Sequence, residues 1–225
     1  MFSEAFMKLW DNGVIQLGIW ETIYMTLLST VIAYVIGLPV GIILSITDKD
    51  GICPLPWLNK LLGIIVNIFR SIPFVILMVA LLPAAKVVVG TSIGNRAMIF
   101  TLVVAAAPYV ARMVESSIKE VDKGVIEAAQ AMGTSSFRII TKVLIPEAKP
   151  ALIVGAVIST VTILGYSAMA GTIAGGGLGK IAIINVYQRS KYDIIWICVA
   201  LTVIIVEIIQ EIGMRIALKT DKRIR

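Results

Sequence analysis

One glycine-rich stretch has the composition of a phosphate-binding loop. The run 175–179 is followed by Lys180, and such backbone amides beside a lysine bind nucleotide phosphates in P-loops. A Walker A loop, however, needs glycine at position 174 and serine or threonine at 181, where the sequence has Ala174 and Ile181. The dinucleotide-loop spacing also fails, because Lys180 stands where its third glycine belongs. We therefore expect a flexible turn here, as a hinge or an outer gate lining, and no nucleotide site.

The residue types used in enzyme catalysis are poorly represented. The chain has no histidine among its 225 residues, so a histidine metal site or a histidine general base is excluded. Its two cysteines, Cys53 and Cys198, do not make a disulfide framework. We expect no catalytic, cofactor-binding or metal-binding residue in this chain, and energy for any work must come from another chain.

The composition is that of an integral membrane protein. Hydrophobic residues make up 58% of the chain and charged residues 15%, whereas soluble domains carry about a quarter charged residues. No charge occurs from Thr22 to Thr47 or from Pro150 to Gly179. Each run exceeds the roughly 20 helical residues that cross a bilayer core. Since helices satisfy their own backbone in lipid, we predict an all-α membrane fold.

The apolar blocks predict five spans, of which the second is irregular. That span contains Arg70, followed by Pro73, which removes a backbone donor and should kink the helix. Either residues 61–69 lie in the cytoplasmic interface and the span begins near Ser71, or Arg70 faces a wet bundle interior. The five predicted spans are residues 22–46, 62–85, 97–114, 151–174 and 193–213.

The distribution of lysine and arginine predicts the orientation in the membrane. Thirteen of these residues lie in 47–60, 112–149 and 215–225, against six in the segments on the opposite side. Because basic residues concentrate in cytoplasmic loops, the N-terminus should be outside and the C-terminus inside. The same bias explains the net charge of +6 without a nucleic-acid partner. We expect a multi-pass membrane protein.

The polar segment 112–149 is the longest on the cytoplasmic side, and a loop of this length is usually structured or functional. We predict one short helix from Val125 to Met132, ended by Gly133. Capping residues at 134–136 should start a second helix that continues to about Ile145. Pro146 and Pro150 should then restart the chain toward the fourth span.

A spaced pattern within this segment resembles the cytoplasmic signature of ABC-importer permeases. That signature is Glu-Ala-Ala, three residues, glycine, nine residues, then Ile-x-Leu-Pro. The spacing fits throughout, and Val143 for isoleucine and Ile145 for leucine are conservative departures. The matching residues here are Glu127, Ala128, Ala129, Gly133, Val143, Ile145 and Pro146.

This resemblance implies a type I ABC-importer permease fold with a cytoplasmic coupling helix. In that family the coupling helix rests in a groove of a separate ATPase subunit, where small side chains such as Ala128, Ala129 and Ala131 allow close approach. Glu127 would meet a basic residue of the partner. The resemblance also implies two permease copies, two cytoplasmic ATPases that hold ATP and Mg, and an external substrate-binding lipoprotein. The permease itself is then not an enzyme.

Further runs are similar to the methionine-importing branch of that family, and the resemblance covers roughly residues 20–213. It implies import of methionine, in its L- and D-forms, through a permease domain at 20–213, with an external segment at 1–19 and a basic cytoplasmic tail at 214–225. The runs that carry this similarity are residues 67–74, 89–94, 106–115, 165–171 and 175–179.

Three alternatives remain open at this point. The first is the same machine with another small amino acid or solute as its substrate. An ion-coupled secondary carrier usually shows inverted repeats, and none is visible here. A membrane anchor has no use for the spaced coupling pattern. Neighbouring genes for an ATPase and a lipoprotein would favour the importer. The candidates for lining a translocation pathway, each of which helix packing also explains, are Tyr166, Ser167, Met169, Tyr109 and Asn67.

Overall fold

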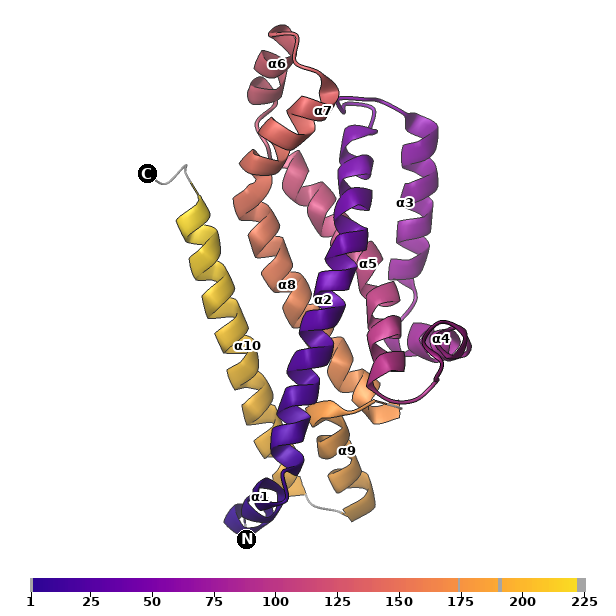
Figure 1. Cartoon of the computed structure of the whole chain (residues 1–225), viewed down its shortest axis with the longest axis vertical. Helices are drawn as coiled ribbons and strands as arrows, with labels where there is room; N and C mark the ends of the chain where they lie inside the picture. Colours follow the sequence, from indigo (N-terminus) through magenta and orange to yellow (C-terminus); the bar gives the residue numbers. More distant parts are fainter. Residues whose placement is uncertain (1, 174, 190–191, 222–225) are drawn as a thin grey trace. The chain divides into compact units, whose positions relative to one another are not determined.

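The computed structural model describes residues 2–173, 175–189 and 192–221, and long helices dominate this part of the chain (Figure 1). Four helices are long and apolar enough to cross a membrane. A broken pair supplies a fifth span if it is counted as one, in agreement with the five predicted spans. The four helices are α2 (Val14–Ile46), α5 (Asn95–Lys119), α8 (Ile145–Ile173) and α10 (Tyr192–Thr220).

The second predicted span is two helices rather than one kinked helix. Helix α3 (Pro56–Ser71) and helix α4 (Phe74–Val89) meet at a bend of 106°. Pro73 occupies the cap position of α4 with an extended ψ of 134°, and a residue before proline is itself driven out of the helical region. The chain therefore breaks at the proline. Arg70 lies exposed in the last turn of α3, where the helix dipole favours a cation.

Five shorter elements complete the described part of the chain. One of them, α9, corrects a sequence expectation, because the predicted turn at 175–180 contains the start of this helix at Gly177. The short elements are α1 (Phe2–Asp11), α6 (Lys123–Ala131), α7 (Ser136–Ile139), the π-helix η1 (Ile140–Leu144) and α9 (Gly177–Arg189).

The chain divides into two compact units, each with its own apolar core. The first unit comprises Met1–Ile32, Ile72–Ala106 and Thr160–Gln210, and the second comprises Ala33–Ser71, Ala107–Ser159 and Glu211–Arg225. The first core contains Leu164, Leu178, Ile194, Cys198 and Ile205, and the second contains Leu44, Val66 and Ala111.

Glycines in the second unit allow its helices to approach closely. A Cβ atom on Gly41 of α2 would lie 2.5 Å from the Ala111 carbonyl oxygen and 2.6 Å from Val114 Cβ, both in α5. A Cβ on Gly37 would lie 2.7 Å from Val110 Cγ1. Small residues are the usual means of close helix packing in membranes.

Candidate functional site

The predicted coupling segment contains the short helices α6 and α7 (Figure 1), and Gly133 lies between them in the sequence. Asp122 caps the first turn of α6 with its side chain. At the other end the Gly133 amide donates to the Gln130 carbonyl at 2.9 Å, and the Thr134 amide donates to the Ala129 carbonyl at 3.2 Å. This pairing is a Schellman motif, which requires a left-handed residue, and Gly133 has φ of 73°. The prediction that Gly133 ends the helix is confirmed.

The Glu-Ala-Ala residues do not all face the same way. Glu127 and Ala128 are exposed, and so is Ala131 one turn later. Ala129 is only 5% exposed and packs inside the second unit. The expectation that Ala129 lies against a partner is therefore wrong for this residue, because the helical period turns it toward the chain's own core.

Large apolar side chains near Gly133 were missed by the sequence reading. Met132 is 77% exposed and Phe137 is 74% exposed, and Val125 is exposed as well. Exposed apolar side chains within a polar segment are typical of interaction surfaces. We call Val125, Met132 and Phe137 the apolar patch. Its signal in the sequence is the presence of large apolar residues in a segment otherwise rich in charge.

The chain after Gly133 continues without the predicted restart at the prolines. Helix α7 passes into the π-helix η1, in which the Ile145 amide donates to the Ile140 carbonyl, and α8 follows directly. Pro146 is the second residue of α8, and Pro150 lies inside it. A proline ring clashes with the carbonyl four residues earlier in an α-helix, and the wider π-turn relieves that clash for Pro146. Val143 and Ile145 are half-buried, and Pro146 is exposed.

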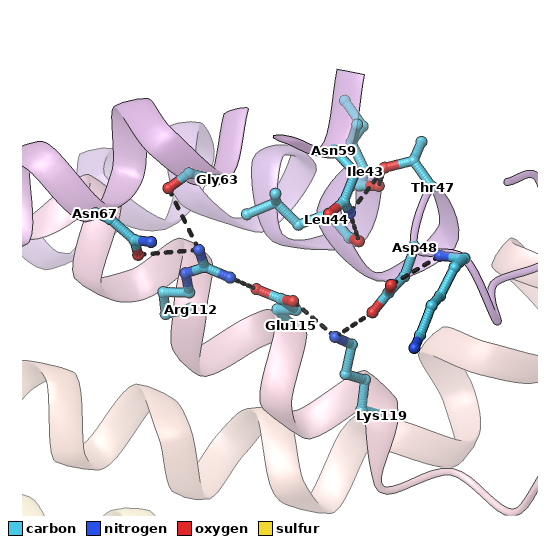
Figure 2. A network of polar contacts seen from close by, with 11 residues as sticks. Ile43, Leu44, Thr47, Asp48, Asn59, Gly63, Asn67, Arg112, Glu115 and Lys119 are labelled. Atoms are coloured by element: carbon cyan, nitrogen blue, oxygen red, sulfur yellow. Dashed lines mark hydrogen bonds and ion pairs between the residues drawn. The ribbon is translucent and has the colours of Figure 1, made fainter. Parts of the chain in front are cut away.

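A chain of charged groups lies next to the coupling segment in the second unit. Figure 2 shows Glu115 of α5 between two cations. Its Oε2 accepts from the Arg112 guanidinium at 2.5 Å, and its Oε1 accepts from Lys119 Nζ at 2.9 Å. Lys119 Nζ also donates to Asp48 Oδ2 at 2.7 Å, in the connection after α2. The hydrogen bond from Lys119 holds the pKa of the Asp48 carboxyl below its usual range, so this carboxylate is ionised at neutral pH.

The same chain of contacts extends to α3. The Arg112 Nη2 group donates to Asn67 Oδ1 at 3.0 Å and to the Gly63 carbonyl at 3.4 Å (Figure 2). Asn67, a predicted pathway residue, thus accepts a hydrogen bond from Arg112 and is still exposed. Tyr109, another pathway candidate, is half-buried in α5. We call Asn67, Arg112, Glu115, Lys119 and Asp48 the polar chain.

A pocket of about 330 Å³ joins the polar chain to the coupling helix. Asp48 and Lys119 line it on one side, and Lys123 and Glu127 of α6 line it on the other. The pocket therefore borders both the coupling helix and the charged contacts. The sequence could not predict this arrangement, because Asp48 and Lys119 are 71 positions apart.

The remaining pathway candidates lie in the first unit. Tyr166 stacks on Phe74 with ring centroids 4.5 Å apart and planes 5° from parallel. Ser167 is buried, donates to a carbonyl of its own helix at 2.8 Å and accepts from Thr26 Oγ1 at 3.4 Å. Met169 is exposed. Of the three, Met169 is the most exposed, while Tyr166 and Ser167 contact neighbouring helices.

The glycine-rich run is held in place and is not the flexible turn expected from sequence. Glu21 of α2 accepts from the Gly177 amide at 2.8 Å and from Asn95 Nδ2 at 2.9 Å. Thr22 Oγ1 accepts from the Leu178 amide at 2.9 Å. These groups cap the start of α9. Gly177 has φ of 86°, and a Cβ there would lie 2.7 Å from Thr22 Oγ1.

No group of three or more histidine, cysteine or acidic residues that would hold a metal ion occurs within residues 2–173, 175–189 and 192–221. The chemistry of the described residues is that of contact surfaces and polar networks.

Residues 37–225 match the family described as "Binding-protein-dependent transport system inner membrane component". The match covers most of the chain, so the chain belongs to this family of membrane permeases. The probable D-methionine transport system permease protein MetI of Vibrio cholerae is 44% identical over 213 residues, which is 95% of each chain. The D-methionine transport system permease protein MetI of Escherichia coli K12 is 50% identical over 154 residues, 68% of this chain and 71% of the relative.

Solved structures agree with the sequence comparison. The inward-facing MetNI methionine ABC transporter has a chain 44% identical to this one, with a TM-score of 0.91 over 93% of this chain and 97% of the other. An amino acid ABC transporter at 18% identity, with a TM-score of 0.78, shares the fold. The fold is that of type I ABC importer permeases, as the sequence predicts.

Proposed function

We propose that this chain is the permease of an ATP-driven importer that moves methionine, in its L- and D-forms, into the cytoplasm. The observation that carries the proposal is the relative from Vibrio cholerae, which is aligned over 95% of both chains at 44% identity and is described as a D-methionine permease. The MetNI structure, similar over nearly the whole chain, supports the same substrate.

The test is transport by the reconstituted complex. The chain is purified with the ATPase and the binding protein from the same genome, placed in proteoliposomes, and supplied with ATP and Mg. Uptake of radiolabelled methionine should be competed by L- and D-methionine and not by a basic amino acid. Import of another solute with no response to methionine would overturn the substrate and leave the permease assignment intact.

The proposed assembly has two copies of this chain, two cytoplasmic ATPase subunits and an external binding lipoprotein. ATP hydrolysis takes place on the ATPases. The contact surface proposed on this chain includes Glu127, Ala128 and the apolar patch around Gly133. Its support is the exposure of these groups on a rigidly capped helix. Val143, Ile145 and Pro146 would hold this helix at the correct distance from the membrane.

The proposed route for the solute uses Tyr166, Ser167 and Met169 of α8 together with Tyr109 and Asn67. A flexible thioether such as Met169 adapts well to an irregular apolar solute. The proposed orientation is N-terminus outside and C-terminus in the cytoplasm, with the permease domain at 20–213, an external segment at 1–19 and a basic tail at 214–225. The excess of basic residues in 112–149 supports this orientation.

A further inference from the structure

The first unit contains a pocket of about 420 Å³ to which sequence analysis assigned no ligand. It lies where α5 and α9 begin. Its charged lining residues are Glu21, Arg96 and Lys180, and Thr91, Asn95, Gly175 and Gly176 also line it. Clefts of this size hold small molecules, with a few placed polar groups that set their orientation.

The two cations of this pocket are not paired. Within the described residues, neither the Arg96 guanidinium nor the Lys180 ammonium has a hydrogen bond or an ion pair. Arg96 is the second residue of α5, and Lys180 is the fourth residue of α9. A helix dipole disfavours positive charge in the first turn. Neither cation therefore gains stability for the fold from its position, and both line the same pocket.

The carboxylate of the pocket is fixed but not neutralised. Glu21 accepts from the Asn95 amide group and from the Gly177 amide, which are uncharged donors. No cation of the described residues forms an ion pair with it. Each carboxylate oxygen can accept a second hydrogen bond. The pocket thus presents a held negative charge and two separate positive charges that do not satisfy one another.

We propose that this pocket binds the zwitterionic head of an α-amino acid. Its carboxylate is bound by Arg96 and Lys180, and its ammonium group is bound by Glu21. A zwitterion gives both signs of charge a partner, whereas a lone anion would leave the Glu21 carboxylate without a cation and a lone cation would leave both basic groups without an anion. In the predicted orientation the pocket faces the exterior, so it would receive an amino acid before transport. This inference rests on the proposed function, because it takes the transported solute as the ligand.

The direct test is equilibrium binding of radiolabelled methionine to the permease–ATPase complex without the binding protein. Arg96→Gln and Lys180→Gln should each weaken binding about tenfold, since each removes a charge-assisted contact. Both residues are exposed, so the variants should fold. Lys86→Gln is the matched control, because Lys86 is an exposed cation of the same unit that does not line the pocket. Wild-type binding by both pocket variants would overturn the proposal.

Specificity supplies a readout that a folding defect cannot imitate. Wild-type complex should bind methionine at least tenfold tighter than N-acetylmethionine, which lacks the ammonium group, and than methionine methyl ester, which lacks the carboxylate. Glu21→Gln should reduce the preference over N-acetylmethionine and leave the preference over the ester. An unchanged order of preference in Glu21→Gln would count against the assigned role of Glu21.

An ethanolamine phospholipid carries the same pair of charged groups, so the source must be distinguished. Binding is measured in vesicles of phosphatidylcholine and phosphatidylglycerol, with and without phosphatidylethanolamine. The tenfold effect of Arg96→Gln on methionine binding should be equal in both. Loss of methionine binding on addition of the ethanolamine lipid would assign the pocket to a headgroup and overturn the amino-acid proposal. A complex that imports methionine with unchanged binding in all variants would refute this inference alone, whereas one that imports none would refute the proposed function.

Discussion

The Glu115 carboxylate accepts from the Arg112 guanidinium at 2.5 Å, one helical turn earlier in α5. The same carboxylate binds Lys119 through its other oxygen, and its side chain is only 10% exposed. A buried anion between two cations joins α3, α5 and the connection after α2 within the second unit. The polar chain therefore makes the base of the coupling segment a rigid part of that unit.

Replacing Glu115 should destabilise the protein much more than replacing an exposed glutamate with the same spacing. In Glu115→Ala the Arg112 and Lys119 charges lose their shared partner, and the expected loss is about 1 to 3 kcal/mol. Glu211→Ala is the matched control. Glu211 also pairs with a cation four residues later, Arg215, but its side chain is 62% exposed. The expected loss there is below about 0.5 kcal/mol.

Thermal unfolding of the purified complex, followed by tryptophan fluorescence, compares the two variants. Equal midpoints for Glu115→Ala and Glu211→Ala would contradict the structural role of the buried carboxylate. The ratio of methionine imported to ATP hydrolysed is measured on the same preparations. A lower ratio in Glu115→Ala alone is expected, because the coupling segment then has a less rigid base.

Bulk at Gly133 should separate the ATPase from the permease without any clash inside the chain. No atom of the described residues lies within 4 Å of a Cβ placed on Gly133, so only backbone strain of about 1 kcal/mol acts on folding. The Gly133→Trp variant should therefore remain folded, but less of the ATPase subunit should co-purify with it. Gly90→Trp is the control, because Gly90 also ends a helix at φ of 80° in open space. Equal ATPase recovery with both variants would count against contact at Gly133.

Some features of the structure could be predicted from the sequence, and others could not. The helix end at Gly133 was predicted, because a left-handed backbone favours glycine whatever surrounds it. The helix that continues through Pro146 was not predicted, because the π-turn before it has no characteristic residue types. The burial of Ala129 depends on which face of α6 its own chain covers, and local spacing does not report that. The cap of Glu21 on Gly177 joins positions 156 residues apart, beyond any local pattern.

An alanine at Gly41 should force apart two helices of the second unit. Its Cβ would lie 2.5 Å from the Ala111 carbonyl oxygen. Because this oxygen belongs to the backbone, the clash can be relieved only if the backbone of one helix moves. Overpacking of this kind costs about 1 to 3 kcal/mol. Gly165→Ala is the control, because nothing of the described structure lies within 4 Å of its Cβ in α8. That variant should be neutral or slightly more stable, since alanine favours helix by about 1 kcal/mol. Apparent unfolding midpoints in detergent provide the comparison, and a stable Gly41→Ala would refute the close approach.

The two native cysteines supply a test of orientation that needs no new residue. Cys53 is exposed in the connection between α2 and α3, whereas Cys198 is buried in the first unit. If the segment 47–60 is cytoplasmic, a membrane-impermeant maleimide should label the chain in inside-out vesicles and not in intact spheroplasts. Cys53→Ser should abolish the labelling in inside-out vesicles, because the thiol of Cys198 is shielded by packing. In that background Ile93→Cys, at an exposed position of the connection between α4 and α5, should show the opposite pattern. Labelling of Cys53 in intact spheroplasts, together with protection of position 93, would reverse the proposed topology.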